Sequence, residues 1–160
     1  AGLELIDAMN ELGVLADVSH LSDAGFWQLA TRVKGPFVAS HSNARAVCGH
    51  PRNLTDDMIR ALAKKGGVMG LNFFAPFLRT GAQASCVGDM VRQLRHVRQV
   101  GGSGVLALGT DFDGISGRLE LADSAALPAL AERLSAAGFS GDEVDGFMHK
   151  NALRVFEEAL

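Results

Sequence analysis

Four short runs of apolar residues stand out along the chain, and each is rich in small or β-branched side chains. They occupy residues 14–19, 36–40, 67–71 and 105–110. None of these runs alternates regularly between apolar and polar positions. Strands that are buried on both faces, as in parallel sheets, have this pattern. We therefore predict four buried strands.

Helical patterns separate these runs. Apolar residues at spacings of three and four predict helices over 3–12, 87–100, 127–137, 142–148 and 151–160. Ser22 and Thr55 are predicted N-caps of two further helices, and Ser140 with Glu143 predicts a capping box. The resulting order is one helix followed by four strand–helix units, which is typical of an α/β fold with a parallel sheet.

A polar residue that can take part in catalysis follows each predicted strand: His20, His41, Asn72 and Asp111 in chain order. The carboxyl ends of parallel strands share one rim, and in α/β folds that rim holds the active site. A single histidine after a strand is more often structural than a ligand. Two at neighbouring strand ends favour a metal site, because imidazole nitrogen is a preferred zinc ligand. We predict that His20 and His41 bind one metal ion.

Asp111 and Arg52 each allow two interpretations. Asp111 is either a turn residue or a catalytic carboxylate that faces the metal and accepts a proton from water, and we favour the catalytic role. Asp113, which precedes Gly114, is interpreted as a turn residue. Arg52 is either a solvated surface group or a clamp that binds a carboxylate through two parallel hydrogen bonds.

The composition and net charge limit the classes of protein to which this chain can belong. The 160 residues suit a single domain over 1–160, and 48% of them are hydrophobic. The net charge of −3, without a basic stripe, gives no support for a nucleic-acid partner. We find no membrane span and no secretory signal, so a cytoplasmic location is expected. Cys48 and Cys86 are expected to be free thiols, although a single bridge between them stays open.

Six stretches resemble the membrane dipeptidase family, also called renal dipeptidases, in the family's order. They are 12–20 (LGVLADVSH), 40–44 (SHSNA), 51–54 (PRNL), 68–74 (VMGLNFF), 109–114 (GTDFDG) and 151–156 (NALRVF). The resemblance implies a zinc-dependent hydrolase on a (β/α)8 barrel, which cleaves dipeptides by metal-activated water. It makes His20 and His41 ligands of the second of two zinc ions and Asp111 the aspartate beside the bridging water. It makes Arg52 the residue that binds the substrate carboxylate, and places Asn72 on the pocket wall.

The family's first-metal ligands, a His-x-Asp pair, and its bridging glutamate have no match in this chain. The resemblance therefore covers the C-terminal half, about four of eight barrel units. It predicts at most one partial zinc site here, whereas the intact enzyme has two zinc ions.

Half a barrel would leave two strand edges and an apolar inner face in water, at a cost of about 25 cal/mol per Å². We therefore expect a partner: either a missing N-terminal half or another copy of the chain in a homo-oligomer. The leading hypothesis is a dipeptidase, here as a C-terminal portion that is inactive alone. The alternative is a non-catalytic half-barrel fragment or interaction module with a vestigial metal site.

Overall fold

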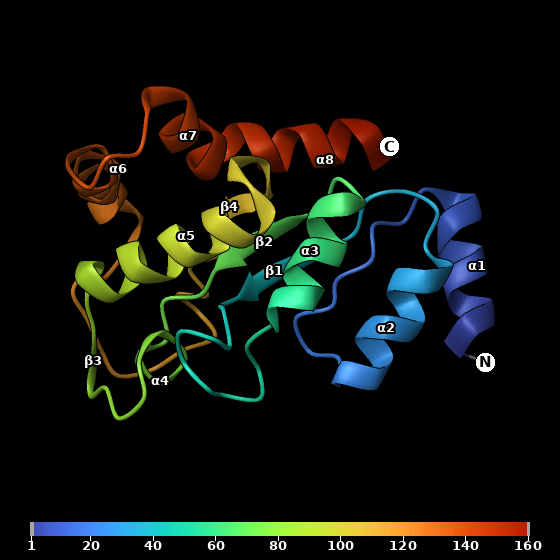
Figure 1. The fold of residues 1–160 in the computed structure, drawn as a ribbon, viewed down its shortest axis with the longest axis horizontal. Coiled ribbons are helices and arrows are strands. Elements are labelled where there is room, and N and C mark those ends of the chain that lie inside the picture. Colours follow the sequence, from blue (N-terminus) through green and yellow to red (C-terminus); the bar gives the residue numbers. More distant parts are fainter. Residues whose placement is uncertain (1, 160) are drawn as a thin grey trace.

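A computed structural model describes residues 2–159, and a three-stranded parallel sheet lies at its centre (Figure 1). The strands run in the order β1-β2-β4: β1 (Val38–Ser42), β2 (Val68–Leu71) and β4 (Leu106–Leu108). Helices connect each strand to the next, as parallel neighbours require. The predicted α/β fold with a parallel sheet is confirmed.

The helices of the described chain agree closely with the apolar spacing of the sequence. They are α1 (Gly2–Leu12), α2 (Asp23–Arg32), α3 (Asp56–Lys64), α4 (Ala75–Leu78), α5 (Val87–Gly101), α6 (Leu127–Ala136), α7 (Gly141–Asp145) and α8 (Asn151–Ala159). Ser22 and Thr55 cap α2 and α3 through their side-chain oxygens, and Ser140 with Glu143 forms the predicted capping box. The short helix α4 was not predicted.

Shorter elements complete the chain. They are the parallel pair β3 (Ala84–Ser85) and β5 (Arg118–Leu119), the 3₁₀ turns Ser103–Val105 and Ser124–Ala126, and the π-helical turn Gly146–Lys150. The predicted helix 142–148 is thus divided, because the helical hydrogen bonding changes to the π pattern after Asp145.

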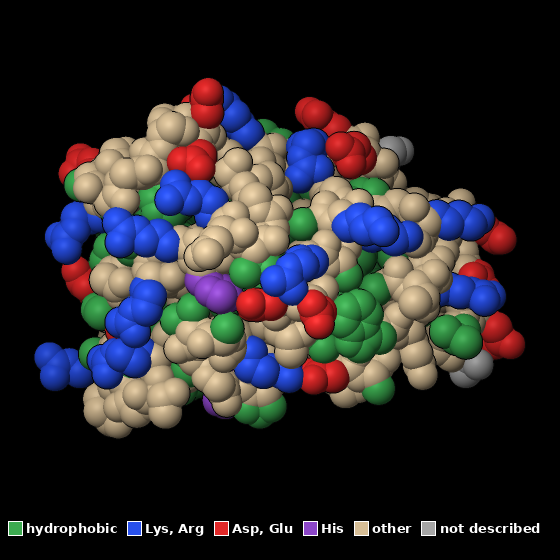
Figure 2. Space-filling view, viewed as in Figure 1, with side chains coloured by type: hydrophobic (Ala, Val, Ile, Leu, Met, Phe, Trp, Pro, Cys, Tyr) green, Lys and Arg blue, Asp and Glu red, His purple; other side chains and the backbone are tan. Residues whose placement is uncertain are grey.

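One face of the sheet is covered by α3 and α5, which pack against each other (Figure 1). Ile59, Leu62 and Val97 from these two helices are fully buried in the main core. Acidic and basic side chains are both spread over the outer surface of this helical layer (Figure 2). The layer therefore has the amphipathic character of helices on the outside of an α/β fold.

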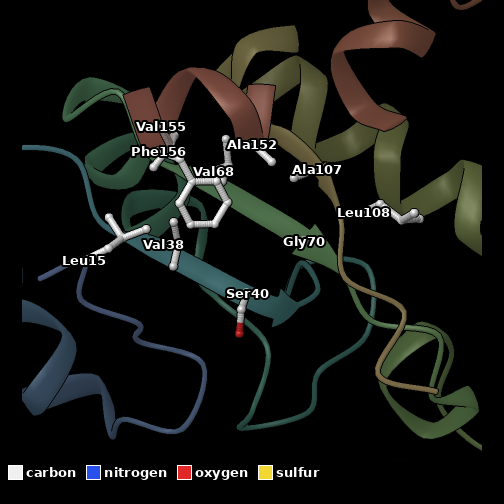
Figure 3. Close-up of a pocket in the computed structure, with 10 residues that line it drawn as sticks. All are labelled: Leu15, Val38, Ser40, Val68, Gly70, Ala107, Leu108, Ala152, Val155 and Phe156. Carbon is white, nitrogen blue, oxygen red and sulfur yellow. The ribbon is translucent and has the colours of Figure 1, made fainter. Parts of the chain in front are cut away.

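The opposite face of the sheet is only partly covered, by α8 (Figure 3). Val155 packs there against Val68 and Ala107 in a small separate cluster. A largely apolar pocket of about 170 Å³ remains beside this cluster, and Phe156, which lines it, is 51% exposed. The inner face of the sheet is thus open in this chain.

The predicted strand over 14–19 is wrong as a regular strand. This segment meets β1 only at an isolated bridge, where Val38 donates to Ala16 O and accepts from Val18 N. The next ladder bond would join Ser40 N to Val18 O. Ser40 N instead donates to the side chain of Asp17, at 3.0 Å. The ladder stops there because a side-chain oxygen has replaced the backbone acceptor.

The strand predicted over 36–40 lies two residues further along, as β1. Its pairing with β2 is regular at Val38 and Ala39 and shifts before Ser42. His41 therefore lies within the irregular part of β1 and not after the strand. Such bulges re-aim side chains and are frequent beside active sites.

Cys48 and Cys86 are both free thiols, as expected. Between residues 2 and 159, no helix combines the length and the apolar character that crossing a membrane requires.

Candidate active site

His20 and His41 face each other at the rim of the sheet. Their Nε2 atoms are 2.9 Å apart, and their ring centroids are 4.9 Å apart at a tilt of 57°. Two imidazole nitrogens that bind one tetrahedral zinc ion at about 2.0–2.1 Å would be separated by about 3.3 Å. The two nitrogens are therefore close to the separation that one ion would require, and metal binding by this pair stays a prediction.

A network of serines and one carboxylate supports this pair. Asp17 Oδ1 accepts from the backbone N–H of both Ser19 and Ser40, each at 3.0 Å, and Asp17 Oδ2 accepts from Ser40 Oγ at 2.5 Å. Ser40 Oγ in turn lies 2.8 Å from His41 Nδ1, and Ser19 Oγ accepts from His41 N at 3.0 Å. The network ties together the two segments that carry the histidines.

The charge of Asp17 fits its role as an acceptor. Desolvation raises the pKa of Asp17, but hydrogen bonds from Ser40 and Ser19 outweigh it and hold the pKa below its ordinary value. Asp17 is therefore ionised at neutral pH and accepts every hydrogen bond that it makes.

Asp111 follows β4 and is held by Asn72, which follows β2. Asn72 Nδ2 donates to Asp111 Oδ2 at 2.9 Å, while Asn72 Oδ1 accepts from Phe74 N at 2.7 Å. Asn43 completes the arrangement by bonding the backbone of Asn72 through both its amide atoms. The Asn72 side chain is fully buried, so the structure places it behind Asp111. Direct contact with substrate stays a prediction for this residue.

The backbone at Asp111 has an unusual conformation. Asp111 has φ 62° and is the only non-glycine residue with positive φ between residues 2 and 159. This conformation costs an L-residue about 1–2 kcal/mol, and it recurs at functional sites. Gly114 donates its N–H to Asp111 O, and a Cβ at Gly114 would lie 2.2 Å from Asp111 Oδ1. The turn that contains Asp113 and Gly114 therefore fixes the position of the carboxylate.

Arg52 extends from the loop between β1 and α3. Its Nε donates to Ser19 O at 3.2 Å, and its guanidinium carbon lies 5.6 Å from the ring centre of Phe77, a residue of α4. Its terminal nitrogens make no hydrogen bond or ion pair within residues 2–159. The side chain is thus fixed near its base, and its outer edge is free to bind an anion.

One pocket brings these groups together. Its volume is about 260 Å³, and its wall includes His20, His41, Arg52, Asp111, Phe74 and Phe77. Four of the five residues that the sequence singled out therefore share one cavity, and the fifth, Asn72, holds one of the four. The pocket joins nitrogen ligands, a carboxylate, a guanidinium and an aromatic wall.

The described residues contain no group of three or more His, Cys, Asp or Glu side chains arranged to hold a metal. Catalytic zinc sites usually have three protein ligands and one open position. His20 and His41 fit zinc in donor type and in spacing, but they form a partial set.

Sequence reasoning missed the supporting residues Asp17, Ser40 and Phe77. A signal was present for the first two: they interrupt apolar runs directly before the two histidines. Phe77 gave no signal, because its role depends on the position of α4. Among the other histidines, His96 pairs with Asp56 at 2.7 Å and does not line the pocket.

Relatives of known sequence match nearly the whole chain. The model of the membrane dipeptidase family (peptidase family M19) matches residues 1–160. A Klebsiella pneumoniae protein, described as an uncharacterized protein in the pqqA 5′ region, is 41% identical over 98% of this chain. The chain covers only 59% of that relative.

Solved structures agree in fold. A metallopeptidase of family M19, called dipeptidase AC, superposes with a TM-score of 0.93 at 33% identity, over 99% of this chain and 48% of its own. A metallopeptidase from Rhodobacter sphaeroides, liganded with a phosphinate mimic of the dipeptide L-Ala-D-Ala, gives 0.93 at 33% identity, over 99% and 46%. The strands and helices described above form about half of the TIM-like barrel of these neighbours. This chain belongs to the membrane dipeptidase family, peptidase family M19.

Proposed function

We propose that this chain carries the C-terminal part of the active site of a zinc-dependent dipeptidase. The observation that carries the proposal is the pocket in which the facing His20 and His41 nitrogens share one wall with Arg52 and Asp111. Family membership and the dipeptide mimic bound to the Rhodobacter relative support this choice of substrate.

In this proposal His20 and His41 hold one zinc ion through Nε2. Zinc bound there supplies Lewis-acid polarisation of the scissile carbonyl. Asp111, held by Asn72 at 2.9 Å, orients the attacking water and accepts its proton. The strained backbone and the turn at Gly114 keep this carboxylate in place without the need for reorganisation during the reaction.

Arg52 accounts for the restriction to short peptides. Its free outer nitrogens bind the terminal carboxylate of the substrate through parallel hydrogen bonds. A carboxylate bound at that point leaves room in a pocket of about 260 Å³ for a small substrate only. Phe74 and Phe77 provide the apolar wall against which the substrate side chain packs.

The remaining metal ligands come from a second polypeptide segment that lies against the open face of the sheet. An exposed apolar side chain lies at that face: Phe156 of α8 lines the pocket there and is 51% exposed. Burial of such a surface stabilises an assembly by about 25 cal/mol per Å². We infer that an N-terminal half barrel covers it, and we call the chain with this segment the assembled enzyme. A second copy of the chain is the competing occupant.

Zinc content and kinetics test the proposal. The assembled enzyme should contain about two zinc ions per barrel and hydrolyse dipeptides. Arg52→Ala should raise KM for dipeptides about 10- to 100-fold, as expected for loss of a charge-assisted pair. Arg60→Ala is the matched control, because Arg60 lies on the outer face of α3 and pairs with Asp57.

The opposite results are equally informative. An unchanged KM in Arg52→Ala would remove the assigned role of this arginine. If the assembled enzyme contains no zinc and has no hydrolytic activity, a non-catalytic half-barrel module is favoured. The incomplete set of metal ligands in this chain supports that alternative. Size-exclusion chromatography tests the assembly separately: a soluble 16.8 kDa monomer would contradict the need for a covering segment.

A further inference from the structure

A chain of three side chains leads from a carboxylate to one of the proposed zinc ligands. Ser40 Oγ donates to Asp17 Oδ2 at 2.5 Å and lies 2.8 Å from His41 Nδ1. His41 Nε2, on the far side of the same ring, lies 2.9 Å from His20 Nε2. Ser40 is thus the link between Asp17 and the ring, and Figure 3 shows its hydroxyl directed away from the ring of Phe156.

The orientation of the Asp17 carboxylate is fixed by the backbone. Its Oδ1 accepts from two N–H groups, those of Ser19 and Ser40, and both distances are 3.0 Å. Only the second oxygen is left for the Ser40 hydroxyl. An ionised carboxylate can only accept, so the single hydroxyl proton of Ser40 must point to Asp17.

This direction decides where the proton of the neutral His41 ring lies. The Ser40 hydroxyl uses its only proton in the hydrogen bond to Asp17. Its oxygen can therefore only accept a hydrogen bond from His41. The hydrogen bond at 2.8 Å therefore requires a proton on His41 Nδ1, which leaves the lone pair on Nε2. Ser19 Oγ, 3.4 Å from Ser40 Oγ, is placed to donate a further weak bond to the same oxygen.

We propose that Asp17 and Ser40 are positioning residues that fix the Nδ1–H tautomer of His41 and thereby present its Nε2 lone pair to zinc. The inference deepens the proposed function and rests on it for the identity of the metal. Outer groups that hold a ligand histidine in this way typically change metal affinity about 10- to 100-fold when they are removed. Here the relay consists of a carboxylate, a hydroxyl and an imidazole.

Nitrogen NMR of the metal-free assembled enzyme tests the tautomer directly. Long-range ¹⁵N–¹H spectra of the neutral ring distinguish a protonated ring nitrogen from an unprotonated one. The expected result is a protonated Nδ1 and an unprotonated Nε2 for His41. A protonated Nε2 in the unchanged chain would overturn the proposal.

Asp17→Asn provides the sharpest variant. The two backbone N–H groups require an oxygen at the Oδ1 position, so the amide nitrogen must face Ser40 Oγ. The amide then donates to Ser40, whose own proton turns toward His41 Nδ1. His41 is expected to switch to the Nε2–H tautomer. A residue with only a structural role would not reverse the position of this proton.

Ser40→Ala removes the link and should leave His41 without a fixed tautomer, whereas Ser40→Thr keeps the hydroxyl and should restore it. Ser135→Ala is the matched control, because Ser135 lies on α6 and its hydroxyl donates to the backbone oxygen of Ala131. Circular dichroism and melting curves confirm that each variant is folded. An unchanged His41 tautomer in both folded Asp17→Asn and folded Ser40→Ala would overturn the relay.

Zinc affinity supplies a second and separate readout. In the assembled enzyme, competition with a fluorescent zinc indicator should show about 10- to 100-fold weaker zinc binding in Asp17→Asn and Ser40→Ala than in the unchanged protein and in Ser135→Ala. Equal zinc affinity in all four proteins would overturn the role of the relay in metal binding. If His41 has the expected tautomer but the assembled enzyme binds no zinc, the proposed function is contradicted and the tautomer assignment is not.

Discussion

Asn72 donates from its amide nitrogen to Asp111 Oδ2 at 2.9 Å, across 39 residues of sequence. The two residues come from the ends of neighbouring strands, β2 and β4, which pair in parallel. Their hydrogen bond explains how a carboxylate with a strained backbone is kept in one orientation at the pocket wall.

Replacement of Asn72 should therefore affect both stability and activity. Asn72→Leu keeps a similar volume but leaves Asp111 Oδ2 and Phe74 N without their partner, which should cost about 1–3 kcal/mol in the free energy of unfolding. In the assembled enzyme we expect kcat to fall more than KM rises. Asn10→Leu is the control, since Asn10 also makes two hydrogen bonds but lies away from the pocket. Equal kcat in the two variants would contradict the role of Asn72.

Gly114→Ala should displace Asp111. A Cβ at this position would lie 2.2 Å from Asp111 Oδ1, so the carboxylate must rotate away from Asn72. We expect a loss of about 1–3 kcal/mol in stability and a large loss of kcat in the assembled enzyme. Gly88→Ala is the control, because Gly88 has open space around it within α5 and alanine favours a helix. A fully active Gly114→Ala variant would show that the position of Asp111 does not matter.

Phe77→Leu should weaken substrate binding through Arg52. The guanidinium lies 5.6 Å from the Phe77 ring centre, and His50 contacts the same ring at a centroid distance of 4.5 Å. Loss of the cation–π contact should weaken substrate binding by about 0.5–1 kcal/mol. KM for a dipeptide should therefore rise about two- to fivefold at unchanged kcat. Phe77→Tyr should retain the normal KM. If Phe77→Leu also has a normal KM, the ring does not position Arg52.

Asp89 should make stability depend on pH in acid. The residue is only 3% exposed and accepts from Arg79, Arg92 and Cys86 at 3.0, 2.5 and 3.1 Å. Burial raises the pKa of Asp89, but hydrogen bonds from Cys86 and Arg79 and the charges of Arg79 and Arg92 outweigh it. The pKa is therefore lower than usual.

A lowered pKa fixes the sign of this effect. The stabilisation from Asp89 is fully present above the ordinary aspartate pKa of about 3.9 and is lost as pH falls through the folded-state value. Asp89→Asn should cost about 1–3 kcal/mol at pH 7 and less in strong acid, as measured by urea unfolding. Asp57→Asn, at an exposed pair with Arg60, should change little. A cost for Asp89→Asn that is independent of pH would contradict this assignment.

The order of elements was predictable because it depends on local patterns. N-capping side chains located the first residues of α2 and α3, and the predicted helix over 87–100 agrees with α5 to within one residue. The strand over 14–19 was predicted wrongly for a non-local reason. Its apolar residues suit a strand, but the Asp17 side chain takes the N–H of Ser40 that the ladder would have used. The competition between this side chain and the backbone acceptor involves residues far apart in the sequence, so no local pattern indicates it.

From sequence alone, several polar residues that could take part in catalysis were predicted to gather on one rim, because strand ends in a parallel sheet must share an edge. The prediction thereby placed His20, His41, Arg52 and Asp111 around what proved to be one pocket. The residues that support them became evident from the packing of the folded chain: Asn72 behind Asp111, Phe77 beside Arg52, and Asp17 with Ser40 behind His41. These contacts join segments far apart in the chain, so their distances and hydrogen-bond directions arise only when the strands and loops are packed together.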